Sequence, residues 1–297
     1  MTNQRLAMTA TRELRLDVGK PVTLDDIDPR EMPVGPQSKR DGAAVLEQIR
    51  VDFKKLQEAL WAEGRAAGEQ DGRRVLVVLQ GMDTSGKGGV VRNVGGLLNP
   101  QWLRVAGFAT PTAAERRHHF LWRIRKQLPG AGMIGFFDRS HYEDVLVPRV
   151  QKTISESVAQ ERITEINAFE QELAESGVRL LKCYLHVSPE HQRERLLARL
   201  DRPAKRWKYN PADLVVRSQW SQYQQFYEEA LQQCASDVSP WHLVPGDRKW
   251  YRNWAVAQLL LDALQDLAPQ LPPPAFDVDT ERAALLKDDP LTRAARR

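Results

Sequence analysis

The sequence predicts an α/β fold of three layers, in which a parallel β-sheet is flanked by helices on both faces. Segments typical of strands alternate with segments typical of helices, which favours parallel strands joined by helical crossovers. A glycine-rich loop also joins the predicted strand 74–79 to the helix predicted after it, as in phosphate-binding α/β proteins. With 297 residues, 42% of them hydrophobic and 28% charged, the chain is long enough to bury a sizeable core.

Each predicted element follows from a local pattern. Apolar residues recur at three- and four-residue steps over 43–67, as an amphipathic helix requires. Pro189 directly after Ser188 marks the start of a helix, because serine caps helices and proline suits their first turn. In chain order we expect helix 43–67, strand 74–79, helix 87–98, strand 103–108, helix 113–127, strand 133–137, helix 155–176, strand 178–187, helix 189–200, helix 212–231, strand 241–244 and helix 250–267.

Two ends and one internal segment break this alternation. Residues 1–41 carry prolines and charges without sustained periodicity and are expected to form an arm. Residues 269–297, with three consecutive prolines, are expected to form a tail. A single domain is therefore expected over 42–268. Within it, 201–211 combines two prolines with a basic, aromatic run and predicts a mobile loop.

Composition excludes several classes of protein. No apolar run approaches the roughly 20 residues needed to cross a bilayer, and residues 1–28 lack the apolar core of a signal peptide. We therefore expect a cytoplasmic protein with no membrane partner. Cys183 and Cys234 are too few for a disulfide framework or a zinc site, so both are expected to be packed thiols.

The net charge of +4 is mild, so the distribution of basic residues says more than their sum. They gather in three clusters, at 116–119, 123–126 and 199–208. A single cluster of this kind is most often a solvated helix face. Several clusters beside a phosphate-binding loop favour a polyanion site instead.

The glycine-rich loop reads Gly81-Met-Asp-Thr-Ser-Gly-Lys-Gly-Gly and matches the first part of the Walker A pattern. Backbone N–H groups, the start of the next helix and Lys87 would all face one anion. The alternative is a tight glycine turn without a ligand. Because a strand precedes the loop and a helix follows it, we favour a phosphate site, with these expected ligands: Gly81, Ser85, Gly86, Lys87 and Gly88.

The loop departs from the common P-loop in two ways. Gly88 stands where Ser or Thr normally binds Mg²⁺, and Asp83 lies inside the loop. A carboxylate could replace the missing hydroxyl as a ligand, because Mg²⁺ prefers hard oxygen donors. Asp83 could instead only cap the turn. Asp138 closes the apolar run 134–138 and predicts a Walker B acid, so Asp83 and Asp138 could together hold one or two Mg²⁺ ions.

The basic segment 199–213 predicts a lid, because phosphoryl transfer requires cations that close over spread negative charge. The lysines and arginines of this segment are candidate phosphate ligands. Trp207 could stack on a base or anchor the lid to the core, and we favour the anchor.

Three segments in this order resemble the polyphosphate kinase 2 family. They are the loop 81–89, the run Phe137-Asp-Arg-Ser-His-Tyr-Glu-Asp-Val-Leu-Val, and Arg202-Pro-Ala-Lys-Arg-Trp-Lys-Tyr. Residues 120–123 and 247–253 resemble further family stretches. The resemblance as a whole spans about 46–267. It implies a P-loop kinase-like fold with a helical lid, and reversible Mg²⁺-dependent phosphoryl transfer from inorganic polyphosphate to nucleoside mono- or diphosphates.

The resemblance also implies roles for particular residues. Asp83 and Asp138 would be metal-binding and catalytic, and Lys87 and Arg139 would be catalytic groups on the reacting phosphates. Tyr142 and Glu143 would contact the nucleotide. Further phosphate or polyphosphate ligands would be Arg92, Arg123, Arg199, Lys205 and Lys208.

Two positions depart from the family pattern. Gly88 replaces an acidic residue often found after the lysine, and Asp138 stands where some relatives carry Asn. The first departure bears on the order of the loop and the second on metal occupancy. The continuation after Asp138 resembles the branch that accepts AMP, or both AMP and ADP.

Two other functions compete with this interpretation. One is an ATP-dependent nucleotide kinase, which would form product with ATP but not with polyphosphate. The other is a non-catalytic nucleic-acid-binding P-loop protein, although no recognised nucleic-acid module supports a specific nucleic-acid partner. We expect the basic clusters to line a channel for polyphosphate. We also expect the protein to form a homo-oligomer. No histidine is required as a covalent intermediate, because in-line transfer needs no nucleophile from the protein.

Overall fold

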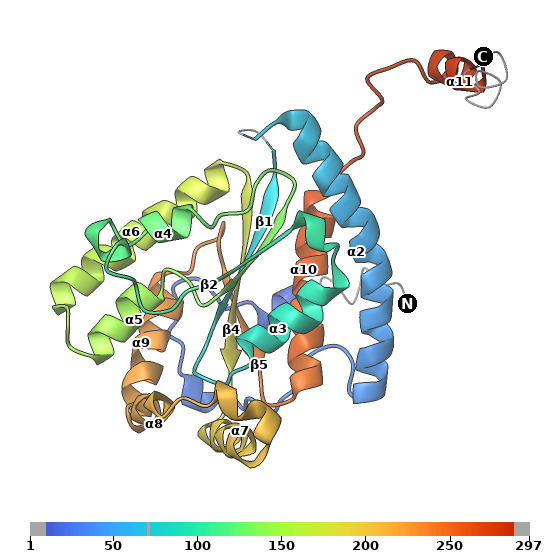
Figure 1. Ribbon diagram of the computed structural model, residues 1–297. Coiled ribbons are helices and arrows are strands. Elements are labelled where there is room, and N and C mark those ends of the chain that lie inside the picture. The colour runs from blue at the N-terminus through green and yellow to red at the C-terminus, as the bar shows by residue number, and fades with distance from the viewer. Residues whose placement is uncertain (1–9, 70–71, 288–297) are drawn as a thin grey trace.

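The computed structural model describes residues 10–69 and 72–287 (Figure 1). Five strands form one sheet in the order β2-β3-β1-β4-β5, and all four pairings are parallel. The strands are β1 (Arg74–Gln80), β2 (Leu103–Gly107), β3 (Ile134–Asp138), β4 (Val178–His186) and β5 (Trp241–Pro245). The predicted parallel sheet is confirmed.

Helices cover both faces of the sheet (Figure 1). One face carries α2 (Lys39–Ala67), α3 (Lys87–Val94) and α10 (Lys249–Leu267). The other carries α4 (Trp122–Arg125), α5 (Glu143–Val150), α6 (Glu156–Glu175) and α9 (Trp220–Gln233). Alternate residues of β1 serve the two cores, with Leu76 on one face and Val77 on the other, because successive side chains of a strand point in opposite directions.

The carboxyl ends of β1 and β3 lie side by side. Leu79 of β1 pairs with Asp138 of β3, so the glycine loop and the predicted Walker B acid emerge at one edge of the sheet. Between these two strands the strand order changes direction, and α/β folds bind ligands at such a switch point. The helices α7 (Pro189–Asp201) and α8 (Ala212–Ser218) lie beyond this edge.

Helix caps account for several predicted starts. Ser188 caps α7 by accepting a hydrogen bond from His191 N at 3.1 Å, with Pro189 in the first turn, as predicted. Ser38 caps α2 in the same way, through Asp41 N at 3.2 Å. The first helix therefore starts four residues before the predicted position. Side-chain acceptors of this kind satisfy N–H groups that the helix itself leaves free.

The prediction of one helix over 113–127 is wrong. The segment instead forms a short 3-10 turn, Glu115–Arg117, and the four-residue helix α4. Thr112 and Glu115 exchange hydrogen bonds and start the turn. His118 then adopts an extended backbone and stacks on Trp122 with 4.0 Å between ring centroids, which interrupts the helical path.

Other predicted segments differ in detail. The helix predicted over 212–231 divides at Gln219 into α8 and α9, where the Ser218 hydroxyl donates to Val215 O at 2.7 Å and competes with the helical backbone. The segment predicted as an irregular loop contains the 3-10 helix η5 (Pro203–Lys208). The helix α5 was not predicted, because its eight residues include Pro148 and are too few to show a period.

Both ends of the described chain contain more structure than expected. Residues 10–38 pack against the domain, with Leu14 and Leu24 buried and Leu16 N donating to Trp241 O at 2.9 Å. The tail contains α11 (Val278–Lys287), which lies away from the body in Figure 1. Residues 1–9 of the predicted arm and 288–297 of the predicted tail lie outside the described residues.

The structure bears on the predictions made from composition about membrane spans and cysteines. Within 10–69 and 72–287, no helix is both long enough and apolar enough to span a membrane. Cys183 and Cys234 are free thiols buried in the two core layers, as predicted.

Candidate active site

The glycine loop between β1 and α3 has the left-handed turns that its glycines permit. Gly81 has φ 138° and Gly86 has φ 102°, and Thr84 adopts φ 66° although it is not glycine. A Cβ atom on Gly81 would lie 2.6 Å from Leu185 O, so close backbone approach also requires glycine here. The Thr84 and Ser85 hydroxyls are buried and have no hydrogen-bond partner within the described residues. Such orphaned groups in a glycine loop suit an anion ligand.

Lys87 begins α3 and folds back over the loop. Its side chain is 7% exposed, and Nζ donates to Gly81 O at 2.5 Å and to Met82 O at 3.2 Å. Burial and the charge of Arg139 lower the pKa of Lys87, and the carboxylates of Asp83 and Asp138 only partly oppose this. Nearby carboxylates therefore balance the charge of the ammonium group only in part, which suits a phosphate ligand at the loop.

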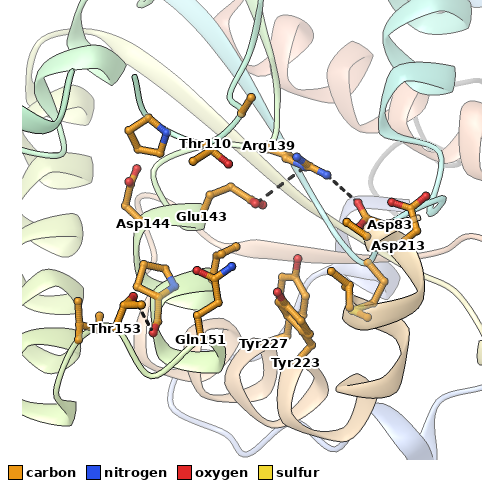
Figure 2. Close-up of a pocket in the computed structure, with 18 of the residues that line it drawn as sticks. Asp83, Thr110, Arg139, Glu143, Asp144, Gln151, Thr153, Asp213, Tyr223 and Tyr227 are labelled. Carbon is orange, nitrogen blue, oxygen red and sulfur yellow. Dashed lines mark hydrogen bonds and ion pairs between the residues drawn. The ribbon is translucent and has the colours of Figure 1, made fainter. Parts of the chain in front are cut away.

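Asp83 and Arg139 form an ion pair across the loop, with Arg139 Nη2 2.7 Å from Asp83 Oδ1 (Figure 2). Burial alone would raise the pKa of Asp83, but the charges of Lys87 and Arg139 hold it below its usual value. Arg139 directly follows β3 and has φ 67°, a conformation that costs energy outside glycine and often marks functional positions. The same guanidinium lies 3.9 Å from Glu143 Oε2. Burial raises the pKa of Glu143 although Arg139 and Lys87 oppose it.

Asp138 approaches the loop at Gly88. A Cβ atom on Gly88 would lie 3.1 Å from Asp138 Oδ2, so a larger residue would press against the carboxylate. The space in which the common P-loop places its hydroxyl-bearing residue therefore adjoins a carboxylate from β3.

Two cavities meet at this point. The larger, of about 810 Å³, is named here the cationic cavity because ten lysine and arginine residues line it together with only two carboxylates, Asp83 and Asp138. The smaller, of about 500 Å³, is named the tyrosine cavity after Tyr223 and Tyr227, which point into it in Figure 2. It has four carboxylates and four arginines, so its lining is balanced in charge. Asp83, Ala109 and Arg139 line both cavities.

Most of the predicted site residues lie at these cavities. The cationic cavity is lined by these predicted residues: Asp83, Gly86, Lys87, Gly88, Arg92, Asp138, Arg139, Arg199, Lys205 and Lys208. Gly81 and Glu143 line the tyrosine cavity. Ser85 lies inside the loop with no exposed surface.

Two further predicted ligands, Arg123 and Tyr142, do not line the cationic cavity. Arg123 lines the tyrosine cavity rather than the cationic one, and its guanidinium is paired with Asp144 at 2.8 Å. Basic residues of the cluster 116–126 thus line the tyrosine cavity, whereas those of 199–208 line the adjoining cationic cavity. Tyr142, predicted to contact the nucleotide, lines neither cavity, because its side chain is 1% exposed and its hydroxyl donates to buried Glu170 at 2.8 Å.

The predicted lid contains Arg199, which is tied down by protein contacts, and Trp207, which is not. Arg199 Nη1 lies 3.1 Å from Asp213 Oδ2 and donates to Lys208 O at 3.0 Å, so it ties together both ends of the basic segment. Trp207 does not anchor the lid to the core, because 78% of it is exposed. Lys208 Nζ lies over its ring, 4.9 Å from the centroid.

Several lining residues were not predicted as ligands. Arg195, Lys249 and Arg252 face the cationic cavity, and Asp213, Tyr223 and Tyr227 face the tyrosine cavity. A signal for Arg195 was present, because it lies one helical turn before Arg199 and so shares its face. The tyrosines carried no comparable signal, since a pair at a four-residue step in an amphipathic helix usually packs into the core.

The two carboxylates at the loop suit a magnesium ion that is held mainly by substrate. No group of three or more His, Cys, Asp or Glu side chains in the described ranges is arranged to hold a metal. Mg²⁺ usually takes one or two protein carboxylates and completes its shell with water and phosphate oxygens. Asp83 and Asp138, which line one cavity, match that donor set.

Known proteins resemble this chain over most of its length. A family model described as polyphosphate kinase 2 matches residues 37–272. The chain is 43% identical over 240 residues to the AMP/ADP-polyphosphate phosphotransferase of Meiothermus ruber, covering 81% of this chain and 86% of that protein. It is 36% identical to the ADP-polyphosphate phosphotransferase of Rhodopseudomonas palustris, covering 88% and 92%. A crystal structure of polyphosphate kinase 2 from Arthrobacter aurescens matches with a TM-score of 0.89 at 42% identity, covering 94% of this chain and 97% of that one.

Proposed function

Because the chain belongs to the polyphosphate kinase 2 family, we propose that it transfers a phosphoryl group reversibly from inorganic polyphosphate to a nucleoside mono- or diphosphate of the AMP/ADP type. The observation that carries the proposal is the meeting of two cavities of different charge at Asp83 and Arg139. One cavity suits a polyanion and the other a nucleotide, and they share the groups at which transfer would occur.

The donor is assigned to the cationic cavity. Its ten lysine and arginine residues far outnumber its two carboxylates, an excess that a single triphosphate does not need but a chain of condensed phosphates does. The names of two relatives support this donor, since the proteins of Meiothermus ruber and Rhodopseudomonas palustris are both called polyphosphate phosphotransferases. Binding should weaken steeply with salt, because a polyanion releases counterions when cations bind it.

The acceptor is assigned to the tyrosine cavity, whose balanced charge and aromatic floor suit a nucleoside. Tyr223 and Tyr227 present their hydroxyls near Asp83 and Glu143 in Figure 2. Burial, with the nearby charges of Glu143 and Asp83, raises the pKa of both tyrosines, so their hydroxyls stay protonated and able to donate at physiological pH. Glu143 remains a proposed nucleotide-binding residue, whereas Tyr142 does not.

The chemistry requires positioning and neutralisation of charge. An oxygen of the acceptor's terminal phosphate attacks the terminal phosphorus of polyphosphate, a P–O–P bond breaks, and the shortened chain leaves with the electron pair. Lys87 and Arg139 would balance charge on the phosphoryl oxygens, and the loop N–H groups would orient them. Asp83 and Asp138 would hold Mg²⁺, which would supply neutralisation of the charge on the phosphates when it is bound.

The proposal is tested by assaying the purified protein with polyphosphate or ATP as donor. AMP, ADP, GMP and GDP are offered separately, with and without Mg²⁺, and products are resolved by chromatography. Lys87→Ala and Asp138→Ala should each lower turnover by at least about a hundredfold, with unchanged circular dichroism. Lys54→Ala, at an exposed position of α2, is the matched control and should retain normal turnover.

Two other outcomes of this assay would contradict the proposal. Product from ATP but never from polyphosphate would identify an ATP-dependent kinase. Near-normal turnover by either active-site variant would show that the site is wrongly assigned.

A further inference from the structure

Arg252 occupies an unusual position beneath the phosphate loop. It comes from α10, is 2% exposed, and donates from Nη1 to Ser85 O at 2.9 Å. A Cβ atom on Gly86 would lie 2.0 Å from Nη1, and one on Gly89 would lie 3.2 Å from Nη2. The guanidinium therefore fills the space that these two glycines leave open, and it supports the loop from behind.

The charge of Arg252 has no counter-charge among the residues that the structure describes. Within residues 10–69 and 72–287, no carboxylate lies within ion-pair distance of this guanidinium, and its Nε has no hydrogen-bond partner. Its second terminal nitrogen donates to Asn253 Oδ1, a neutral acceptor, at 3.0 Å. A buried charge that lacks a partner is strongly unfavourable.

The surroundings make this charge less favourable still. Gly86 is the N-cap of α3, so the guanidinium lies against the positive end of a helix, where an anion would be favoured. Burial, with the charges of Arg195 and Arg92, lowers the pKa of Arg252 to about 10. Arg195 also has a buried terminal nitrogen without a partner among the described residues. Both arginines line the cationic cavity, as does Lys249.

Buried cations that repel one another are stabilised when an anionic ligand balances their charge. The hydrogen bond from Arg252 to Ser85 O is the feature that connects such a ligand to the shape of the loop. We propose that Arg252 is a positioning residue whose counter-charge is the condensed-phosphate donor, so that donor binding and the catalytic shape of the loop stabilise each other.

This inference rests on the proposed function and deepens it. It assigns to Arg252 two linked roles that separate in experiment. The positive charge governs how strongly donor binding stabilises the protein, whereas the planar fork, which reaches Ser85 O and the cavity together, governs turnover. A residue that merely packs beneath the loop would show neither dependence.

The test compares Arg252→Met and Arg252→Lys with the full-length protein. The melting temperature is measured with Mg²⁺, without nucleotide, over a range of polyphosphate concentrations, and initial rates are measured with each substrate varied. Arg179→Met is the matched control, because Arg179 lies on β4 and pairs with Asp266 away from both cavities.

For Arg252→Met we expect the polyphosphate-dependent rise in melting temperature to fall below half that of the wild type. The KM for polyphosphate should rise at least about tenfold, while the KM for nucleotide stays within about twofold. Arg252→Lys should keep most of the melting-temperature rise but lose about tenfold in kcat, because an ammonium group lacks the fork. Arg179→Met should match the wild type.

The inference is overturned if Arg252→Met keeps both the wild-type rise and the wild-type KM for polyphosphate. Should that variant fail to fold, Arg252→Lys decides, and loss of the rise despite the retained charge contradicts the proposal. Polyphosphate turnover by the wild-type preparation is measured in parallel. If the wild type does not turn over polyphosphate, both the proposed function and this inference are wrong. If it does, a failed result for the Arg252 variants contradicts this inference alone.

Discussion

The lack of a side chain at Gly88 has a physical reason in the neighbouring strand. The common P-loop hydroxyl is missing there, and the Asp138 carboxylate lies 3.1 Å from the place where a Cβ would stand. A residue with a side chain would have to displace that carboxylate by a few tenths of an ångström. The glycine thus keeps the acid of β3 close to the loop, which suits a site whose oxygen ligands are carboxylates.

Restoring the hydroxyl should therefore harm the enzyme. We predict that Gly88→Ser lowers kcat about tenfold, because small displacements of catalytic groups are costly, and leaves the melting temperature nearly unchanged. Gly96→Ser is the control, since a Cβ at Gly96 would meet no atom within 4 Å. Initial rates at saturating substrate test this, and a Gly88→Ser enzyme as active as the control would contradict it.

At the scale of elements, a buried polar cluster joins α6 to β4 and to the turn before α5. Glu170 accepts from Lys182 Nζ at 2.5 Å, from the Tyr142 hydroxyl at 2.8 Å and from the Ser239 hydroxyl at 2.9 Å. Burial opposes the charge of Glu170, but Lys182 and His141 lower its pKa to about 2. The carboxylate is therefore ionised at physiological pH and holds α6, β4 and the turn before α5 together.

Removing this carboxylate should destabilise the fold. We predict that Glu170→Gln lowers the free energy of unfolding by about 3 kcal/mol, because Lys182 would be left buried without a counter-charge. Glu172→Gln, two residues along the same helix, breaks only the exposed pair with Arg125 and should cost less than about 1 kcal/mol. Urea unfolding of both variants measures the difference, and equal losses would show that the cluster is not a special source of stability.

At the scale of the whole molecule, the start of the described chain is hydrogen-bonded to α10. The Thr11 hydroxyl donates to Asp262 Oδ2 of α10 at 2.6 Å, and Gln258 donates to the other oxygen at 2.8 Å. Burial raises the pKa of Asp262 to about 6 although both hydrogen bonds oppose the shift. The folded state therefore binds a proton more tightly at this carboxylate than the unfolded chain does.

This shift gives stability a particular pH dependence. The contribution of Asp262 is fully present below its unfolded pKa, near 3.8, and is lost as pH rises through about 6. We predict that Asp262→Asn raises the free energy of unfolding at pH 7.5 by about 1 to 2 kcal/mol and flattens its dependence between pH 4 and 7. Thermal unfolding across this range tests the prediction, which a variant that follows the wild-type pH profile would contradict.

Much of the fold and part of the site follow from local sequence patterns. The strand before the loop, the acid that closes 134–138 and the Ser188-Pro189 helix start depend on neighbours in sequence. Their positions were therefore predictable within one or two residues. The single helix predicted over 113–127 was wrong, because His118 has an extended backbone and Arg123 turns inward to Asp144, 21 residues away in sequence, a contact that no local period contains.

The sequence by itself determined the chemistry of the loop, the family and the alternation of strands and helices, because each depends on residue type and short spacing. Only the tertiary structure decided which charges are paired. It buried Tyr142 beside Glu170 and placed Asp138 against Gly88. It also set Arg252 beneath Ser85, 167 residues away in sequence. Such pairings depend on how distant elements pack, and the division of the site into one cationic and one balanced cavity depends on the same packing.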